Sequence, residues 1–388
     1  MENRPHQTFE KFSRLKCGQI FLRFISVKQL SFILLISAFI TASVLAQTPT
    51  PTPVDDDEVI KVESRLVVVP VSVTDALGQP VLGLKASDFR VMEENRLQEV
   101  AEVSDAEKVP LEIALLFDVS ASTDSMFQFE LETASQFLKE VMRPDDHATI
   151  FTIGERPIMI QARDSADKSQ ISIKQIQSTK ELTAFYDSVL YAANYLAQNT
   201  PQGRRRVILT ISDGEDTNSA GVLKAIWDAE SKLVSTVQGA ELRAIRVKAR
   251  DDAKVREQSK VMKGLQNADT VFYSINPAGS SYQLNQISQF GQNNLQKFAD
   301  ETGGTAFLPK FVPVDLKDKV QNSFNMKKNQ ETLTKIFKQL ANELQAQYLV
   351  QYYSEGDFPA NNYVNLDVNL STPKNYKVRA RQGYFVKN

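Results

Sequence analysis

The sequence predicts an α/β fold: a doubly wound, mostly parallel sheet of Rossmann-like type, inserted in or flanked by a small all-β, sandwich-like domain. Apolar strands alternate with amphipathic helices between residues 110 and 346. Segments with strand-like alternation lie on both sides of that stretch, at residues 59–105 and 347–388. The apolar content of 42% and the charged content of 24% are those of a globular protein with sizeable cores.

Residues 1–46 have the pattern of an export segment. A basic stretch ends at Lys28, and the apolar run LSFILLISAFITASVLA follows it and closes in small residues before Gln47. The run is long for a signal-peptide core and short for a membrane span, so we expect either a cleaved signal peptide or an N-terminal membrane anchor. In both cases the rest of the chain is exported, to the periplasm, the cell envelope or the medium.

Residues 47–58 alternate proline with threonine and then turn acidic, which predicts an extended linker. Beyond the leader the chain carries 39 basic and 45 acidic residues, a net charge of −6 that argues against nucleic acid as the main partner. The only cysteine, Cys17, lies in the leader, so no disulfide is expected in the exported part. His147 is the single histidine after the leader, which excludes a multi-histidine zinc site.

The two flanking segments are predicted to form strands. SRLVVVPVSVTD is rich in β-branched residues, and FRVMEENRLQEV has two alternating runs that indicate a hairpin turning at Glu94–Arg96. QYLVQYYS, YVNLDVNLS and NYKVRARQGYFV continue the pattern near the C-terminus. We expect residues 59–105 and 347–388 to pair into one β-domain, with two unrelated flanking hairpins as the alternative.

Residues 110–346 are expected to form the α/β domain. Its predicted strands are LEIALLF, ATIFTI, RRVILTIS, TVFYSIN and TAFLP, and its predicted helices span residues 127–141, 185–197, 284–301 and 332–344, with a further helix from Val222. A basic stretch at about 238–268 exceeds what a crossover needs, and it reads as a solvated helix or helical hairpin, or as a docking arm for a partner. Residues 309–328 are predicted to be a second, irregular insertion.

Polar residues follow three of these segments. FDVSAS, ELTAFYD and TISDGED contribute Asp118, Ser120, Ser122, Thr183 and Asp213. The carboxyl ends of parallel strands meet at one edge of the sheet, so these side chains are expected to converge. Two carboxylates and three hydroxyls make an all-oxygen set, which suits one Mg²⁺ ion, or Ca²⁺ or Mn²⁺ in its place. Taken alone, Asp118 would more often cap a helix, and Asp213 more often stand in an ordinary turn, than bind a metal.

The spaced DxSxS, the later threonine and the later Asp-Gly resemble the metal-ion-dependent adhesion site (MIDAS) of von Willebrand factor type A domains. The resemblance implies that Ser120, Ser122 and Thr183 bind the metal directly, and that Asp118 and Asp213 act mainly through water or by orienting those ligands. One coordination position is then left for an acidic group of a protein partner. The family often has two glycines before the threonine, whereas Glu181 and Leu182 stand here.

The flanks carry a second resemblance. VPVSVTDALGQPVLGLKASDFRVMEENR ahead of the domain, with LANELQAQYLVQYY and VRARQGYF behind it, is similar to exported bacterial von Willebrand A-related proteins of the type first grouped in Acidobacteria. We therefore expect a metal-dependent binding or adhesion protein, with no enzymatic activity and no contact with membrane beyond the N-terminal segment.

Neighbouring residues are expected to be structural. Glu215 and Asp216 are predicted to face solvent, His147 to serve the fold, and Ile226 and Trp227 to form a helix packing face. Two other functions stay open: a metal-dependent hydrolase or phosphatase using Asp118, which lacks the usual second carboxylate two residues on because Ser120 stands there, and a scaffold domain with no metal-dependent ligand.

Overall fold

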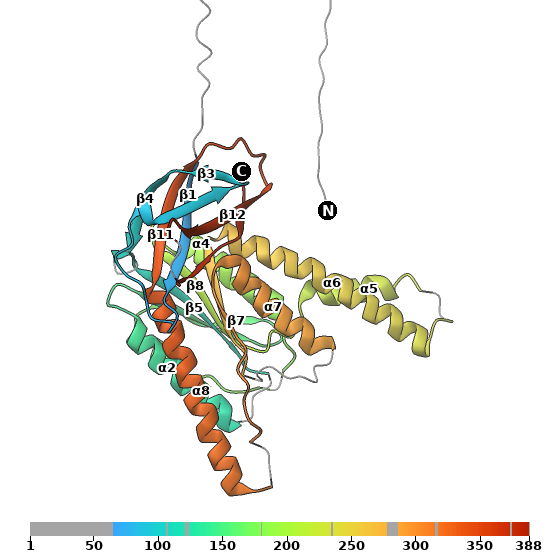
Figure 1. Ribbon diagram of the computed structural model, residues 1–388. Helices are drawn as coiled ribbons and strands as arrows, with labels where there is room; N and C mark the ends of the chain where they lie inside the picture. Colours follow the sequence, from blue (N-terminus) through green and yellow to red (C-terminus); the bar gives the residue numbers. More distant parts are fainter. Residues whose placement is uncertain are drawn as a thin grey trace, which may run out of the picture. The chain divides into compact units, whose positions relative to one another are not determined.

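The computed structural model describes residues 65–105, 108–120, 124–179, 181–233, 236–277, 286–314, 317–372 and 375–387. The predicted leader, the linker and Ser122 lie outside this described part. A six-stranded sheet and two four-stranded sheets make up its β structure (Figure 1). Within the same residues, no helix has the length and apolar character needed to span a bilayer.

The six-stranded sheet has the order β10-β9-β8-β5-β6-β7. Five strands run parallel, and β7 pairs antiparallel with β6 at one edge. The bounds are β5 Leu111–Asp118, β6 His147–Ile153, β7 Pro157–Asp164, β8 Arg205–Ile211, β9 Thr270–Ile275 and β10 Ala306–Phe307. The doubly wound α/β fold predicted from the sequence is therefore confirmed, and β7 is an edge strand that the prediction missed.

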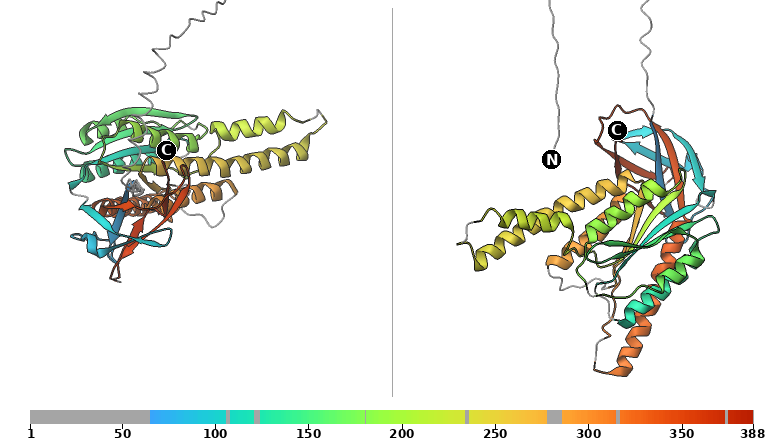
Figure 2. Two further views of the ribbon diagram at one scale, coloured as in Figure 1. Left: turned by 90° about the horizontal axis from the view of Figure 1, so that it is seen from above. Right: turned by 180° about the vertical axis from the view of Figure 1, so that it is seen from behind.

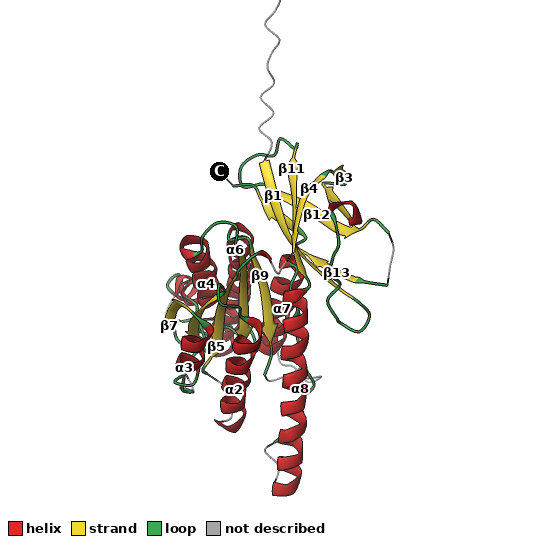
Figure 3. Cartoon of the chain, turned by 90° about the vertical axis from the view of Figure 1, so that its left-hand side faces the viewer, coloured by secondary structure: helices red, strands yellow, loops and turns green. Residues whose placement is uncertain are grey.

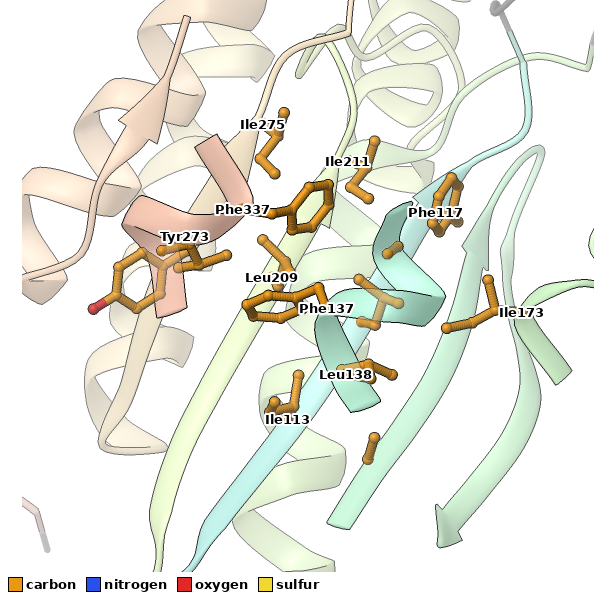
Figure 4. Packing of buried hydrophobic residues seen from close by; sticks show 14 of the residues in the cluster. Ile113, Phe117, Phe137, Leu138, Ile173, Leu209, Ile211, Tyr273, Ile275 and Phe337 are labelled. Carbon is orange, nitrogen blue, oxygen red and sulfur yellow. The ribbon is translucent and has the colours of Figure 1, made fainter. Parts of the chain in front are cut away.

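Helices cover both faces of this sheet, as Figure 3 shows. One face packs against α2 (Asp124–Val141), α3 (Ala166–Ile173) and α8 (Lys319–Gln345). The other packs against α4 (Phe185–Asn199), α6 (Gly239–Asn267) and α7 (Gln286–Thr302). Every residue of β5 is buried for this reason. Figure 4 shows Phe117 and Leu209 of the sheet packed with Phe137 of α2 and Phe337 of α8.

The stretch after β8 forms a helical hairpin. α5 (Ala220–Glu230) runs beside α6, as both views in Figure 2 show. The helical interpretation of residues 238–268 is confirmed in its secondary structure. Only the inner half of α6 enters the core, through Val261 and Leu265 among others.

The prediction for residues 309–328 was wrong from Lys319 onward, where α8 begins. The Asp318 carboxylate caps the helix by accepting hydrogen bonds from the backbone N–H groups of Val320 and Gln321. The buried positions in this first half are asparagines whose amides donate to backbone carbonyls: Asn325 to Pro313 O and Asn329 to Val312 O. Apolar periodicity, the usual signal of a helix, is therefore missing there.

Both ends of the chain contribute to a pair of antiparallel sheets. One has the order β13-β1-β11-β4, the other β14-β12-β2-β3, and a third apolar cluster fills the space between them. The bounds are β1 Arg65–Thr74, β2 Phe89–Glu93, β3 Arg96–Gln98, β4 Val100–Asp105, β11 Gln347–Ser354, β12 Tyr363–Leu370, β13 Lys377–Ala380 and β14 Gly383–Phe385, with a short 3₁₀ helix at Ala86–Asp88.

The two flanking segments interleave strand by strand. β1 lies between β11 and β13, so the alternative of two unrelated hairpins was wrong. The last residue of β4, Asp105, is the register partner of Tyr348 near the start of β11. The predicted hairpin is present, because β2 pairs with β3 and the turn residues Glu94 and Asn95 have φ of 44° and 62°. The domain boundaries drawn from the sequence stay predictions.

Candidate metal centre

The strand order places a switch point between β5 and β8. From β5 the chain continues to β6 and β7 on one side, and from β8 it continues to β9 and β10 on the other. Loops that leave two adjacent strands in opposite directions open a crevice at their carboxyl ends, where α/β proteins bind ligands. Asp118 is the last residue of β5, and Asp213 stands two residues beyond the end of β8.

Asp118 is the centre of the hydrogen-bond network at this point. It is 8% exposed, and its Oδ1 accepts hydrogen bonds from Ser120 N at 3.0 Å and Ser120 Oγ at 2.6 Å. Its Oδ2 accepts from Ser212 Oγ at 2.7 Å. Both carboxylate oxygens are thus engaged, and the side chain is held in one orientation. Ser212, which the sequence interpretation passed over, is fully buried and is the residue that binds β8 to this carboxylate.

Thr183 reaches the same place from the loop before α4. Its Oγ1 donates to Ser120 Oγ at 3.0 Å. The Thr183 backbone is held on both sides: its N–H donates to Thr217 Oγ1, and its carbonyl accepts from the N–H groups of Thr217 and Asn218. Leu182 points its side chain to solvent. Glu181 and Leu182, which precede Thr183, therefore leave it in contact with Ser120.

Asp213 adds a second carboxylate. Its Oδ1 accepts the Glu215 N–H at 2.9 Å. Burial and the negative charge of Asp118 raise the pKa of Asp213 to about 7, and burial likewise raises the pKa of Asp118. Burial disfavours the ionised form of both acids, and the charge of Asp118 further disfavours that of Asp213, which is an electrostatic setting that a bound cation relieves.

The prediction that Asp216 faces solvent was wrong. The carboxylate is buried, and it accepts hydrogen bonds from Tyr186 N in the first turn of α4 and from Ser219 N and Oγ before α5. Burial raises its pKa. Asp216 therefore joins the N-termini of two helices, where a negative charge is favourable. The signal available in the sequence is the Asp-x-x-Ser spacing just before α5.

Trp227 also departs from expectation. Its side chain is 68% exposed on α5, whereas Ile226 packs against the core as predicted. His147 opens β6 at the opposite end of the strands, and its Nδ1 lies 2.9 Å from the Arg163 guanidinium, which binds the buried Glu112 carboxylate. This agrees with a structural role for His147.

The donor set fits a hard cation. Within the described residues, no group of three or more His, Cys, Asp or Glu side chains gathers to hold a metal. The oxygens that do converge belong to three hydroxyls, of Ser120, Thr183 and Ser212, and to the Asp118 carboxylate, all in hydrogen-bond contact. Asp213 is coupled to Asp118 by charge. Such oxygens are the ligands of Mg²⁺ and Ca²⁺ rather than of softer metals. Ser122, the remaining predicted ligand, lies outside the described part.

The fold and the site together define the class of protein. It is an α/β protein with a cluster of hydroxyl and carboxylate oxygens at the switch point of its sheet. No protein-family model matches the sequence, and no curated protein matches it.

Solved structures similar to this chain include three of differing origin. An aerotolerance-related membrane protein from Bacteroides fragilis is 16% identical with a TM-score of 0.32, over 60% of this chain and 98% of its own. The PilB minor pilin of Streptococcus sanguinis is 11% identical with a TM-score of 0.40, over 61% and 62%. Proximal thread matrix protein 1 of the mussel byssus, solved with a zinc-occupied MIDAS motif, is 13% identical with a TM-score of 0.38, over 63% of this chain and 47% of its own.

Proposed function

We propose that the chain is an exported binding protein whose von Willebrand A-type domain holds one divalent cation, Mg²⁺ in the first instance, and that this cation receives an acidic group of a protein partner. One observation carries the proposal. Thr183, Ser120, Asp118 and Ser212, from three separate segments, form one continuous hydrogen-bonded chain at the switch point.

The residues divide into two roles. Ser120 and Thr183, with Ser122, would supply hydroxyl oxygens to the cation. Asp118 holds Ser120 in place through two hydrogen bonds, and together with Asp213 it provides the negative charge that attracts the ion. The bound cation supplies a positive charge with a free coordination position, which a carboxylate completes. Magnesium retains several waters in protein sites, so a site with few direct carboxylate ligands suits it.

An enzyme that uses Asp118 as a phosphoryl-accepting nucleophile is the second candidate. A nucleophile needs a free oxygen within reach of the substrate. Asp118 is buried, and both of its oxygens accept hydrogen bonds, from Ser120 and from Ser212. This geometry favours an orienting role over nucleophilic attack, so the binding function is the conclusion we draw.

Calorimetry with MgCl₂ on the full chain tests the cation site. We expect one site per chain in the wild type, no measurable binding in Asp118→Ala, and unchanged binding in Ser259→Ala, a matched loss of an exposed hydroxyl on α6. Absence of binding in the wild type would refute the proposal. Hydrolysis of p-nitrophenyl phosphate that disappears in Asp118→Ala would establish the enzyme instead.

The partner and the export of the chain need separate experiments. A pull-down from cell-envelope extract, with and without chelator, should recover a protein only when the cation is present. A partner retained equally in chelator would place the interface away from the switch point. Protease digestion of intact cells, compared with lysed cells, tests whether the folded part lies outside the cytoplasm.

A further inference from the structure

We propose that the solvent face of α8 binds an anionic lipid surface, independently of the cation site. The inner face of this helix is committed to the core through Leu333, Phe337 and Leu340. The residues of the outer face recur every three or four positions along α8, and several of them are exposed lysines. These are Lys327, Lys328, Lys335 and Lys338.

The positive charges of these lysines are not neutralised by ion pairs among the described residues. In the part of the chain that the structure describes, no ion pair joins any of the four to a carboxylate. Glu331 is the single acidic residue on the same face, so the stripe keeps a net positive charge while the chain as a whole is at −2. Binding to an anionic surface must therefore use a particular face, because the protein's overall charge does not favour it.

Exposed apolar side chains lie at both ends of the stripe. At the N-terminal end, Val320 and Phe324 are one helical turn apart and are 80% and 64% exposed. At the C-terminal end, the Asn342 side chain donates to Gly78 O at 3.2 Å, which fastens a turn of the β-domain onto this face of α8. Leu77 at the tip of that turn is 84% exposed. From Val320 to Asn342 the helix rises roughly 33 Å at 1.5 Å per residue.

A polar cavity of about 500 Å³ opens where α8 meets that turn. Lys335 and Lys338 line it from the helix, and Lys377 lines it from β13. Its two acids already accept hydrogen bonds: Asp75 from the N–H groups of Leu77 and Gln79, and Glu343 from Thr305 Oγ1 and Gln339 Nε2. Three lysines and two carboxylates leave the lining with one net positive charge, and a hollow of this size can accommodate one phosphate headgroup.

The pattern favours lipid over an acidic protein. Lysines between exposed apolar residues are typical of helices that lie in a membrane interface, where the ammonium groups meet headgroups and the apolar side chains enter the acyl boundary. α8 contains no arginine, the residue that protein carboxylates select for bidentate pairing. Point charges on flexible stems suit headgroups that move laterally.

Vesicle co-sedimentation of the full chain tests the proposal, with chelator present so that the cation site plays no part. Vesicles of phosphatidylcholine alone are compared with vesicles containing one quarter phosphatidylglycerol. The readout is the additional binding that the anionic lipid produces, since the apolar segment Leu30–Ala46 can bind both kinds. We expect Lys327→Glu with Lys328→Glu to reduce this additional binding at least tenfold, and Phe324→Ser to reduce it severalfold.

The matched control is Lys232→Glu with Lys248→Glu, which makes the same change in charge at exposed positions on and before α6. It should leave the additional binding within twofold of the wild type, and circular dichroism should show all variants folded. Equal losses in the two double variants would overturn the proposal, as would wild-type binding indifferent to phosphatidylglycerol. Binding of inorganic phosphate by calorimetry without binding of anionic vesicles would also overturn it, by reducing the face to a free-phosphate site.

Discussion

Thr183 donates its hydroxyl hydrogen to Ser120 Oγ across 63 residues of sequence. Neither residue is held by its own loop alone. Ser120 is fixed by the carboxylate at the end of β5, and Thr183 is fixed by the backbone of residues 217 and 218 beyond β8. Two hydroxyls of this kind, placed by different elements, are set at one point before any ligand arrives, which lowers the cost of binding one.

Ser120→Ala should remove a direct cation ligand and leave the fold in place. We expect Mg²⁺ affinity to fall at least tenfold. The free energy of unfolding in chelator should fall by about 1–3 kcal/mol, because the hydroxyl makes two hydrogen bonds, to Asp118 and from Thr183. Thermal unfolding with and without MgCl₂ measures both quantities. An ion present at 100 times its dissociation constant stabilises the wild type by about 2.7 kcal/mol, and an undiminished shift in the variant would remove Ser120 from the ligand set.

Cation affinity should depend on pH through Asp213. Its carboxyl has a pKa of about 7, so below that pH a proton must leave before the ion binds. We expect affinity to fall by up to about tenfold per pH unit below 7 and to level off above it. Calorimetry between pH 5.5 and 8 is the measurement, and Asp213→Asn should give a flatter curve if it binds at all.

The same carboxyl predicts the stability of the cation-free protein. Its pKa in the folded state lies above the ordinary value of 3.8, so the folded protein binds this proton more tightly than the unfolded chain does. The contribution to stability is therefore fully present below about pH 4 and is lost as pH rises through about 7. In chelator, wild type minus Asp213→Asn should show that decline in denaturant titrations, and a difference that rises with pH would contradict it.

Asp216→Ala should destabilise the protein. The change leaves Tyr186 N and the Ser219 side chain without their buried acceptor, so we expect a loss of about 2–4 kcal/mol in the free energy of unfolding. Urea denaturation measures it. The control is Asp228→Ala, which removes an exposed pair with Lys224 worth about 1 kcal/mol or less. Equal effects of the two changes would show that Asp216 does not hold the two helices.

Glu93 is the corresponding buried acid of the β-domain. Its Oε1 accepts hydrogen bonds from the hydroxyls of Tyr352 and Tyr384, and its Oε2 accepts from Ser354. Glu93→Ala leaves three buried donors unsatisfied, and we expect it to cost about 3–5 kcal/mol in the free energy of unfolding. The exposed Glu102→Ala is the control in the same denaturation experiment, and a loss below 1 kcal/mol for Glu93 would contradict the role assigned to it.

Much of the fold could be predicted because its signals are local. The near-continuous apolar strands, the period-two segments at both chain ends and the Glu94-Asn95 turn each follow from adjacent residues. What was missed depends on distant partners. β7 exposes three consecutive residues, Ile158, Met159 and Ile160, so it shows no buried face, and the first half of α8 buries asparagines whose acceptors lie elsewhere in the chain.

The candidate site likewise contains residues that could be predicted from the sequence and residues that could not. Asp118, Ser120, Thr183 and Asp213 could be chosen because each stands at a strand end or before a helix, where ligands gather. Ser212 could not, because a buried serine looks ordinary until the residue it binds is known. Asp216 was missed although its Asp-x-x-Ser spacing is a local signal, because its second partner, Tyr186 N, lies 30 residues away. Trp227 was misplaced because an apolar helix residue is usually buried, and only the position of α5 on α6 shows that this one is not.

The pairing of Asp105 with Tyr348 has a mechanical consequence. The α/β domain leaves the sandwich at the end of β4 and returns at the start of β11, and these two strands are hydrogen-bonded neighbours. A pulling force applied between β1 and β14 is therefore carried by the hydrogen-bonded strand pairs of the sandwich. It does not pass through the inserted residues. Tension on the chain would load the pairing of β1 with its neighbours β13 and β11, while the switch point between β5 and β8 stays unloaded. A protein that holds a partner under load would in this way keep its binding site folded until the sandwich itself unfolds.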